Sequence, residues 1–358
     1  MGATGALEGD LERVLESWDG EQVLVRHDAP TGSWIFVCVH SRKLGPAAGG
    51  TRMQVYASPA EALLDGTRLA AGMTVKFAVS GFGFGGGKAV IAVPALPEGK
   101  ERAALLRRYG DLVASLGGSF WTGADMNTTP ADLDVVAETC PYVFGRSPEH
   151  GGSGEPGPTT ARGVFHGIRA SLRHALDSPE VEGRTVLVQG VGSVGARLAE
   201  LLAEAGARVL VTDVADERAA EVAERIGAGV VAPADALRAE CDVYAPCATG
   251  ATLSAETIPG LRCHVVAGAA NNQLATQADA DRLRERGILY APDFVVNAGG
   301  IFHYVGIEVL GWDEEALERA LRGIGNTLAE VFARSEADTI STARAADELA
   351  RARLEATG

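Results

Sequence analysis

The chain has 358 residues, of which 46% are apolar and 22% charged, and its formal net charge is −15. This length is enough for two domains with cores of their own, and the composition is that of an ordinary soluble globular protein. The acidic balance argues against nucleic acid or an anionic membrane surface as a partner, because both require a basic face.

Cysteine and histidine usage gives no sign of a metal site or a disulfide framework. The five cysteines are scattered and odd in number, no pair has C-x-x-C spacing, and the histidines are not grouped as metal ligands. No segment has the form of a signal peptide, and no apolar run approaches the ~20 residues of a membrane helix. We therefore expect a soluble cytoplasmic protein that has no metal and binds neither nucleic acid nor membrane.

The first half of the chain mixes helical and strand patterns. Residues 1–20 are acidic and amphipathic and predict a short helix. Further elements are expected as strands at 34–40 and 89–93 and as helices at 59–73 and 101–116, the last one stopped by Gly117-Gly118.

Two lysines, Lys76 and Lys88, stand on either side of a segment with five glycines between Gly81 and Gly87. Such a segment predicts a loop in which the backbone comes close to a ligand, since glycine adopts conformations closed to other residues. Lysines that flank the loop can point into one cleft, where desolvation and mutual repulsion lower their pKa values and make one of them a general base. The alternative is a flexible loop with two solvated lysines.

A boundary or hinge is expected between His150 and Pro158, a segment that collects four glycines and two prolines. After it, short apolar runs at 185–189, 208–213, 242–245, 264–267 and 288–291 alternate with helical patterns. This alternation predicts a doubly wound parallel sheet of the Rossmann type, following an N-terminal α/β domain. We expect domains at 1–150 and 151–335, with two long helices from Glu314 on, the second of which (336–358) packs back on the first domain.

The clearest binding motif is Gly190-Val191-Gly192-Ser193-Val194-Gly195, which follows a predicted strand and opens a predicted helix. Gly190 permits a tight turn, Gly192 lets a pyrophosphate approach the backbone, and Gly195 allows close helix–strand packing. Asp213 ends the next strand, where its carboxylate would accept hydrogen bonds from the adenosine ribose and repel a 2′-phosphate, which favours NAD over NADP. The alternative is an ordinary glycine-rich turn with a capping aspartate.

Together these segments resemble the amino-acid dehydrogenase family that includes glutamate, leucine, valine and phenylalanine dehydrogenases. The resemblance spans nearly the whole chain and looks strongest to the actinobacterial phenylalanine dehydrogenases. The motifs that carry it are Leu44–Arg52, Met73–Lys76, Gly85–Lys88, Thr122–Asn127, Phe144–Ser147, Gly190–Gly195, Gly268–Asn272 and Asn297–Gly300.

The resemblance implies a role for each matching residue. Lys88 is implied to be the general base and Asp125 to bind the ammonium and share in proton transfer, while Lys76 holds the α-carboxylate with backbone N–H groups near Gly49 and Gly50. The remaining implied positions are Asn271 at the meeting of nicotinamide ribose and substrate, Asn272 beside it, Thr160 near the nicotinamide carboxamide, and Asn297 in the neighbouring loop.

The implied reaction is the reversible NAD-dependent oxidative deamination of a hydrophobic L-amino acid to a 2-oxo acid, ammonia and NADH, in a homo-oligomer. Gly123 leaves room for a larger substrate side chain, with Ile301 facing it, so phenylalanine is expected as the preferred substrate. Phe82 and Phe84 depart from the family pattern and leave substrate choice open. Leucine or valine dehydrogenase activity, an inactive NAD-binding sensor, and an NADP-dependent ketone or hydroxy-acid dehydrogenase are the alternatives.

Overall fold

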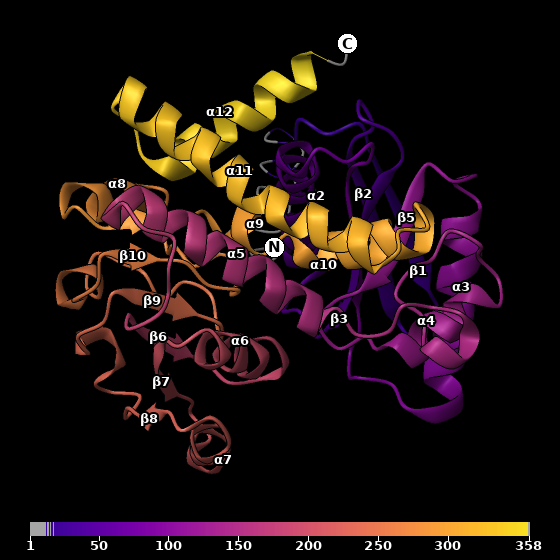
Figure 1. The fold of residues 1–358 in the computed structure, drawn as a ribbon. Helices are drawn as coiled ribbons and strands as arrows, with labels where there is room; N and C mark the ends of the chain where they lie inside the picture. The colour runs from indigo at the N-terminus through magenta and orange to yellow at the C-terminus, as the bar shows by residue number, and fades with distance from the viewer. Residues whose placement is uncertain (1–11, 13, 15, 17, 357–358) are drawn as a thin grey trace, which may run out of the picture. The chain divides into compact units, whose positions relative to one another are not determined.

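The computed structural model describes residues 12, 14, 16 and 18–356, so most of the helix expected over residues 1–20 lies outside the described residues. The described chain divides into two compact units (Figure 1). One comprises the residues up to Glu155 together with those from Arg351 on, and the other runs from Pro156 to Ala350. The division after Glu155 lies within the glycine- and proline-rich segment 150–158.

The first unit is built on a five-stranded mixed sheet with the strand order β1-β2-β4-β3-β5. β1 and β2 are antiparallel, as are β2 and β4, whereas β3 is parallel to both β4 and β5. Its elements are β1 (Gln22–Asp28), β2 (Ser33–Ser41), β3 (Ala47–Gln54), α2 (Pro59–Ser80), β4 (Gly85–Ala92), α3 (Gly99–Ala114), β5 (Phe120–Ala124), α4 (Pro130–Ala137) and the 3₁₀ turn η1 (Pro148–His150).

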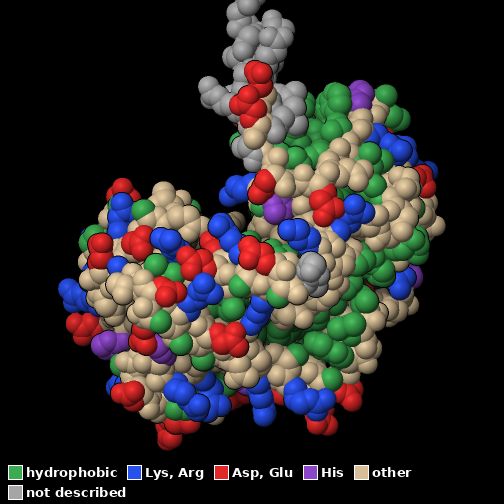
Figure 2. Space-filling view, turned by 90° about the horizontal axis from the view of Figure 1, so that it is seen from above, with side chains coloured by type: hydrophobic (Ala, Val, Ile, Leu, Met, Phe, Trp, Pro, Cys, Tyr) green, Lys and Arg blue, Asp and Glu red, His purple; other side chains and the backbone are tan. Residues whose placement is uncertain are grey.

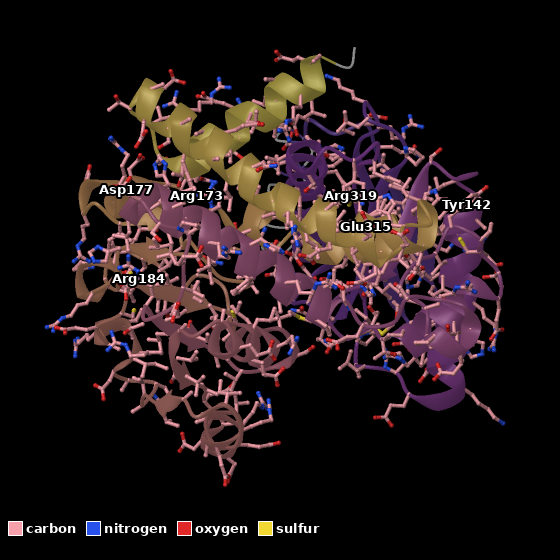
Figure 3. All side chains as sticks on the ribbon, viewed as in Figure 1. Tyr142, Arg173, Asp177, Arg184, Glu315 and Arg319 are labelled. Atoms are coloured by element: carbon pink, nitrogen blue, oxygen red, sulfur yellow. The ribbon has the colours of Figure 1, made fainter. Side chains whose placement is uncertain are left out.

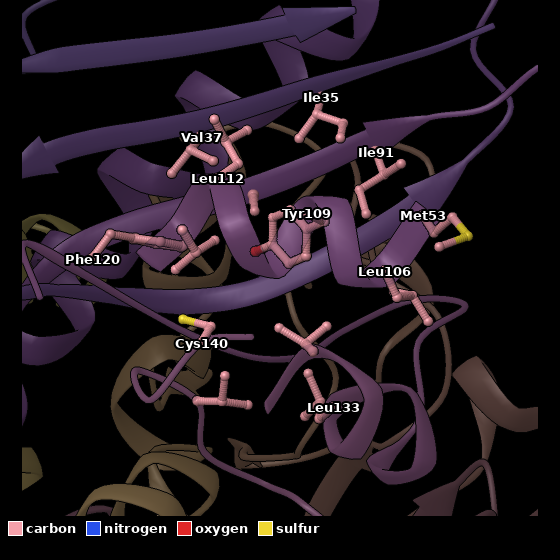
Figure 4. Packing of buried hydrophobic residues seen from close by; sticks show 14 of the residues in the cluster. Ile35, Val37, Met53, Ile91, Leu106, Tyr109, Leu112, Phe120, Leu133 and Cys140 are labelled. Atoms are coloured by element: carbon pink, nitrogen blue, oxygen red, sulfur yellow. The ribbon is translucent and has the colours of Figure 1, made fainter. Parts of the chain in front are cut away.

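Each face of this sheet has its own core, because side chains alternate along a strand. Ile35, Val37, Ala89 and Ile91 face α3 and α4, where they surround the buried Tyr109 (Figure 4). On the other face Phe36, Cys38 and Val90 pack against Ala62, Leu63 and Ala70 of α2. The sheet is therefore covered on one side by α2 and on the other by α3 and α4.

The predicted strand at 34–40 and the helix at 101–116 are confirmed as β2 and α3. The prediction of a glycine loop before Lys88 is wrong in part. The helix α2 continues to Ser80 and contains Lys76, and Gly85-Gly86-Gly87 are the first residues of β4. The strand begins there because glycines leave no Cβ between close backbones: a Cβ on Gly85 would stand 1.9 Å from the Ser41 carbonyl oxygen.

The second unit is built on a parallel sheet and a set of helices. Its elements are α5 (Gly157–Leu176), β6 (Thr185–Gln189), α6 (Ser193–Glu204), β7 (Arg208–Thr212), α7 (Asp216–Ile226), β8 (Gly229–Val230), η2 (Ala236–Arg238), β9 (Val243–Pro246), η3 (Ile258–Gly260), β10 (Val265–Val266), α8 (Ala278–Glu285), β11 (Leu289–Tyr290), α9 (Asp293–Val296), α10 (Gly299–Ile301), the π-helical η4 (Phe302–Val309), α11 (Glu314–Asp338) and α12 (Thr342–Glu355).

The strands of this unit follow the order β11-β10-β9-β6-β7-β8, with every pair parallel. When the strands are numbered from β6 as the first and the sheet is read from β8 to β11, this is the 3-2-1-4-5-6 order of the Rossmann fold. In such sheets ligands bind beyond the carboxyl ends of the strands, at the point where the strand order reverses. Here that point lies between β6 and β9, and the turn after β6 carries Gly190–Gly195. The predicted doubly wound sheet is confirmed.

The two long helices predicted after Glu314 are confirmed as α11 and α12. Glu315 and Arg319, one turn apart on α11, form an ion pair (Figure 3). α11 and most of α12 belong to the second unit, and the chain groups with the first unit only from Arg351 on. In this last stretch Arg353 donates a hydrogen bond to the Val79 carbonyl at the end of α2.

The described surface carries charges of both signs (Figure 2). On the face seen in Figure 2, acidic and basic side chains are interspersed. Among the described residues, no helix combines the length and the hydropathy that crossing a membrane requires.

The close contact between α2 and β4 yields a first prediction. A Cβ on Gly86 would stand 2.1 Å from the backbone nitrogen of Thr74, so Gly86→Ala must push α2 away from the sheet. We expect a loss of about 1–3 kcal/mol in the free energy of unfolding, which is typical of overpacking. Urea unfolding followed by tryptophan fluorescence measures it.

Gly72→Ala in the same helix is the matched control. No atom lies within 4 Å of the Cβ position of Gly72. The alanine should therefore stabilise the unit by roughly 0.5–1 kcal/mol through helix propensity. Equal effects of the two substitutions would contradict the close contact at Gly86.

Candidate functional site

The α2 face of the first unit's sheet carries a buried lysine. Lys88 lies two residues before Val90 on β4, so its side chain shares the face that packs under α2. The residue is only 6% exposed. Its Nζ lies 3.3 Å from Oδ2 of Asp125, which directly follows β5. The structure thus brings together two residues to which the family resemblance assigns proton-transfer roles.

Asp125 is fixed by a short turn. The backbone N–H of Asp125 donates to Thr128 Oγ1 over 2.9 Å, and the Thr128 hydroxyl lies 2.7 Å from the Thr51 carbonyl of β3. Asn127 takes a left-handed conformation with φ 59° within this turn, and its side-chain amide donates to the Met53 carbonyl. The N-cap of the following helix is Thr129.

A buried hydroxyl cluster lies under the site on the other face of the sheet. Thr51, Tyr109 and Thr122 share hydrogen bonds of 2.5 to 2.8 Å. Satisfied buried polar groups of this kind fix geometry, because breaking one leaves a buried group without a partner. The cluster links β3, β5 and α3 by hydrogen bonds, close to the end of β5 that Asp125 follows.

The electrostatics of the pair favour proton transfer. Burial lowers the pKa of Lys88 below its ordinary value, although the carboxylate of Asp125 acts in the opposite direction. Burial also opposes the charge of Asp125, but Lys88 and Arg52 outweigh it and hold the pKa of this carboxyl below its usual range. Lys88 is therefore an amine that gives up its proton more readily than a solvated lysine, beside an aspartate that stays ionised.

Lys76 lies inside α2, near its C-terminal end, and is half-buried. It follows Asp65 by eleven residues, which places both on one side of the helix to within about 20°. Met73, one turn before Lys76, comes within 3.5 Å of the Cβ position of Gly49. Lys76 thus belongs to the helix that covers Lys88.

Gly49 and Gly50 lie in the middle of β3, paired with Thr122 and Gly123 of β5. A Cβ on Gly49 would stand 1.9 Å from the Gly87 carbonyl oxygen, and one on Gly50 would stand 2.8 Å from the Cβ of Asp125. These glycines therefore bring the backbones of β3, β4 and the Asp125 turn closer together than side chains would permit.

The expectation that Gly123 leaves open space for a substrate is wrong. A Cβ on Gly123 would stand 2.3 Å from Cε2 of Phe144, so the ring of Phe144 occupies the space that the missing methyl group leaves. Phe84 also packs inside the unit, between Phe77 and Trp121, with ring centroids 5.9 and 6.2 Å apart. Phe82 is 7% exposed.

The glycine turn of the second unit has the features expected of a dinucleotide site. Gly190 has φ 88°, and a Cβ there would meet Ala248 at 2.6 Å. A Cβ on Gly195 would stand 1.9 Å from the Gly190 carbonyl oxygen, so this glycine permits close helix–strand packing. Gly192 is exposed with no atom within 4 Å of its Cβ position, and it precedes Ser193 and Val194 in the first turn of α6. The backbone N–H groups of that turn are oriented to bind an anion.

Asp213 lies at the end of β7, as predicted, and its carboxylate organises the turn. It accepts hydrogen bonds of 2.9 Å from the backbone N–H groups of Val191 and Ala215. Burial opposes its charge, but these bonds and Arg218, whose Nη1 lies 3.5 Å away, hold the pKa of the carboxyl below its ordinary value. The sequence analysis did not identify Arg218.

The other predicted cofactor and substrate residues of the second unit come from two loops and from the helices α5 and α10. Asn297 donates to Asn271 Oδ1 over 2.8 Å, and its own side-chain oxygen is buried with no hydrogen-bond partner among the described residues. Asn272 has φ 52°. Thr160 lies in the first turn of α5, 3.4 Å from the Cβ position of Gly300, and Ile301 is buried in α10.

Residues that the sequence analysis missed surround Asp125. Arg52 donates to Asp125 and to Asp65, and Tyr56 donates to the same oxygen of Asp65, each over 2.8 Å. The alternation along β3 could have identified Arg52, because the neighbouring Met53 belongs to the core on the other face. Within the described part of the chain, no group of three or more His, Cys, Asp or Glu residues could hold a metal ion.

The fold and the two sites define a two-unit α/β protein in which a Rossmann unit accompanies a unit with a buried lysine–aspartate pair. Comparison with known families is consistent with this class. The sequence model of the Glu/Leu/Phe/Val dehydrogenase dimerisation domain matches residues 31–142, and that of the Glutamate/Leucine/Phenylalanine/Valine dehydrogenase domain matches residues 151–220 and 210–356. The chain therefore belongs to the Glu/Leu/Phe/Val amino-acid dehydrogenase family.

Individual relatives agree over nearly their full length. A leucine dehydrogenase of Geobacillus stearothermophilus is 42% identical over 97% of this chain and 94% of its own. A valine dehydrogenase of Streptomyces coelicolor is 46% identical over 98% of this chain and 97% of its own. The crystal structure of an L-tryptophan dehydrogenase from Nostoc punctiforme superposes with a TM-score of 0.84 at 38% identity, over 97% of this chain and 98% of that one.

These findings make the chain an amino-acid dehydrogenase, which is an oxidoreductase. The predicted family is confirmed. These relatives do not support the expected special likeness to phenylalanine dehydrogenases, because they are named for leucine, valine and tryptophan.

The contact between Gly123 and Phe144 yields a second prediction. Gly123→Ala should displace the Phe144 ring and lower the free energy of unfolding by about 1–3 kcal/mol. Adding Phe144→Leu should recover part of this loss, because the shorter side chain makes room for the methyl group. A double-mutant cycle by urea unfolding measures the coupling, and strictly additive effects would show that the two residues do not share this space.

Proposed function

We propose that this protein catalyses the reversible NAD-dependent oxidative deamination of a hydrophobic L-amino acid to the 2-oxo acid, ammonia and NADH. The observation that carries the proposal is the buried Lys88 with its amine 3.3 Å from Asp125. Binding of a dinucleotide alone requires neither residue. The rival reading, an NAD-binding sensor without turnover, leaves the burial of this charged pair without a purpose, since burying charges costs free energy.

The reaction needs a base and a proton carrier close to the substrate nitrogen. NAD, when bound, would supply the hydride acceptor for the Cα of the neutral amino acid, which would then carry an iminium group. Lys88 as the neutral amine takes a proton from water, and the resulting hydroxide adds to the iminium carbon. The Lys88 ammonium then returns this proton to the amino group. Lys88, neutral again, accepts the proton of the hydroxyl group as the C–N bond breaks, so that ammonia leaves and the carbonyl forms. Asp125 holds the amino group of the substrate as a hydrogen-bond acceptor.

Substrate orientation falls to residues near this pair. We assign the α-carboxylate to Lys76, which lies on α2 one turn after Met73, the residue whose side chain comes close to Gly49 of β3. Backbone N–H groups near Gly49 and Gly50 assist it. A point charge that holds the carboxylate in ground and transition states alike contributes mainly to substrate affinity.

The features of the glycine turn support the proposal that the second unit binds NAD. The pyrophosphate would bind at the exposed Gly192 and at the backbone N–H groups near the start of α6, where Val191, Ser193 and Val194 lie. The ribose would bind at Asp213. The buried Asn297 side-chain oxygen offers an acceptor for an amide N–H. Thr160, Asn271 and Asn272 complete the proposed surface.

For the substrate side chain we propose a hydrophobic group and retain phenylalanine as the first candidate, with leucine and valine as the alternatives that the relatives favour. The support for phenylalanine is the resemblance of Thr122–Asn127 and Phe144–Ser147 to phenylalanine dehydrogenases, and not Gly123, because Phe144 fills the space beside that glycine. Ile301 remains a proposed contact. An NADH-formation assay with L-phenylalanine, L-leucine, L-valine and L-tryptophan tests the function, and no turnover with any amino acid would overturn it.

We further propose a homo-oligomer in the cytoplasm. The family model that matches residues 31–142 is described as a dimerisation domain. All five cysteines are free thiols, in keeping with a reducing compartment.

Lys88→Ala tests the proposed base. We expect kcat to fall by about 10²–10⁴-fold, the usual contribution of a general base, while NADH binding measured by fluorescence stays unchanged. In the wild type, kcat should rise with pH through a pKa below that of a solvated lysine, because Lys88 must be neutral to act and burial lowers its pKa. Near-wild-type turnover of the variant would exclude Lys88 as the base.

Asp213→Ser tests the choice of cofactor. The substitution removes the repulsion of a 2′-phosphate and frees Arg218, so kcat/KM should fall with NAD and rise with NADP. The double variant Asp213→Ser/Arg218→Ala should lose the gain with NADP, since the guanidinium is the cation nearest to that carboxylate. An unchanged NAD/NADP ratio in the single variant would show that Asp213 does not contact the ribose.

A further inference from the structure

We propose that Arg52 is the positioning residue of the proton-transfer pair, and that its guanidinium fixes the Asp125 carboxylate within reach of the Lys88 amine. The inference rests on the proposed function, in which Lys88 and Asp125 handle the protons. It adds Arg52, with Asp65 as its anchor, to the residues that set the rate.

The geometry places one carboxylate oxygen between two cations. Oδ2 of Asp125 accepts a hydrogen bond from Arg52 Nε over 2.8 Å and lies 3.3 Å from Lys88 Nζ. The Arg52 side chain is 17% exposed, so water screens this contact poorly. Arg52 and Lys88 lie on the neighbouring strands β3 and β4 and on the same face of the sheet. The carboxylate cannot turn away from Lys88 without losing its bond to Arg52.

Arg52 is itself held from α2. Its Nη1 donates to Asp65 Oδ2 over 2.8 Å, so the guanidinium binds one carboxylate through Nε and another through Nη1. Asp65 in turn accepts from Tyr56 over 2.8 Å and from Arg68 over 3.0 Å. A planar guanidinium can serve two carboxylates at fixed angles, which the single ammonium of a lysine cannot do. The chain of contacts thus runs from α2 through β3 to the turn after β5.

The charges of this chain act on the pair in opposite directions. Arg52 disfavours the ammonium form of Lys88, and Asp65 favours it. Other titratable groups belong to the elements packed against the pair. They are Cys38 on β2, with its pKa raised to about 12 by burial, Tyr109 on α3 behind the sheet, with its pKa raised by burial, His40 at the end of β2, bonded to Thr74, and Arg68, Lys76 and Tyr56 on or beside α2.

A purely structural ion pair is the alternative, and the same unit contains one for comparison. Arg108 on α3 binds the buried Asp28 at the end of β1 through two hydrogen bonds, of 2.5 and 2.8 Å. Asp28 is also an arginine-bound carboxylate, but no lysine lies beside it in the described ion pairs. Arg108→Gln is therefore the matched control for Arg52→Gln.

The experiment measures the pH profile of kcat, which reports groups of the enzyme–substrate complex, with the best substrate among L-leucine, L-valine, L-phenylalanine and L-tryptophan. Arg52→Gln should lower kcat by on the order of 10²-fold, as misplacement of a catalytic group does. It should also move the lower-pH limb upward by about one pH unit, because the loss of the Arg52 charge removes a cation that disfavours the Lys88 ammonium. Asp65→Asn should move the same limb downward. Arg52→Lys should recover part of kcat.

The outcomes separate the two proposals. A wild type that turns over none of the amino acids contradicts the proposed function itself. In a second outcome the wild type is active, while Arg52→Gln and Arg108→Gln lose similar stability and leave the lower-pH limb of the kcat profile in place. That result contradicts the role of Arg52. If Arg52→Gln fails to fold, as seen by loss of NADH binding and of a cooperative thermal transition, then Asp65→Asn and Arg52→Lys decide by whether the limb moves.

Discussion

The burial of one lysine amine constrains the whole first unit. Lys88 lies between β4 and α2, where a charged amine loses its hydration. The unit compensates with Asp125, which must come from a different strand and be fixed tightly enough to stay close. Thr128, Asn127 and the hydroxyl cluster of Thr51, Tyr109 and Thr122 provide this fixation. The glycines of β3 and β4 serve the same end, because they let three backbones approach closely around the amine.

The second unit solves a related problem with backbone groups. Its glycine turn leaves N–H groups at the start of α6, and the carboxylate of Asp213 binds Val191 within that turn. The same carboxylate therefore holds the turn in shape and presents a negative charge where the ribose of a dinucleotide would lie. A substitution at Asp213 acts on both, which is why cofactor preference and affinity are expected to change together. The buried lysine–aspartate pair and the glycine turn thus reside in different units, each with a core of its own.

The sequence predicted elements well where periodicity was strong and poorly where glycine replaced it. The alternating pattern after residue 185 gave the parallel sheet, and the apolar run at 34–40 gave β2. β3 was missed because its sequence, AAGGTRMQ, has few of the branched residues typical of strands, and Gly85–Gly87 were mistaken for a loop for the same reason. Lys88 and Asp213 were predicted from motif spacing, and Asp125 from the family resemblance. Arg52 was missed together with β3, and Asp65 was missed because its role depends on a tertiary contact between α2 and β3.

Gly123 shows why the reaction can be inferred more firmly than the substrate. The amine, the carboxylate and the glycine turn are fixed by short contacts inside one unit or the other, and relatives named for leucine, valine and tryptophan align over nearly the whole chain. A missing methyl group, in contrast, has meaning only when its neighbours are known. Here Phe144 fills the space beside Gly123, so the absence of a side chain does not create a larger pocket. Substrate size must then depend on side chains that line the bound molecule directly, and the buried lysine–aspartate pair does not determine it.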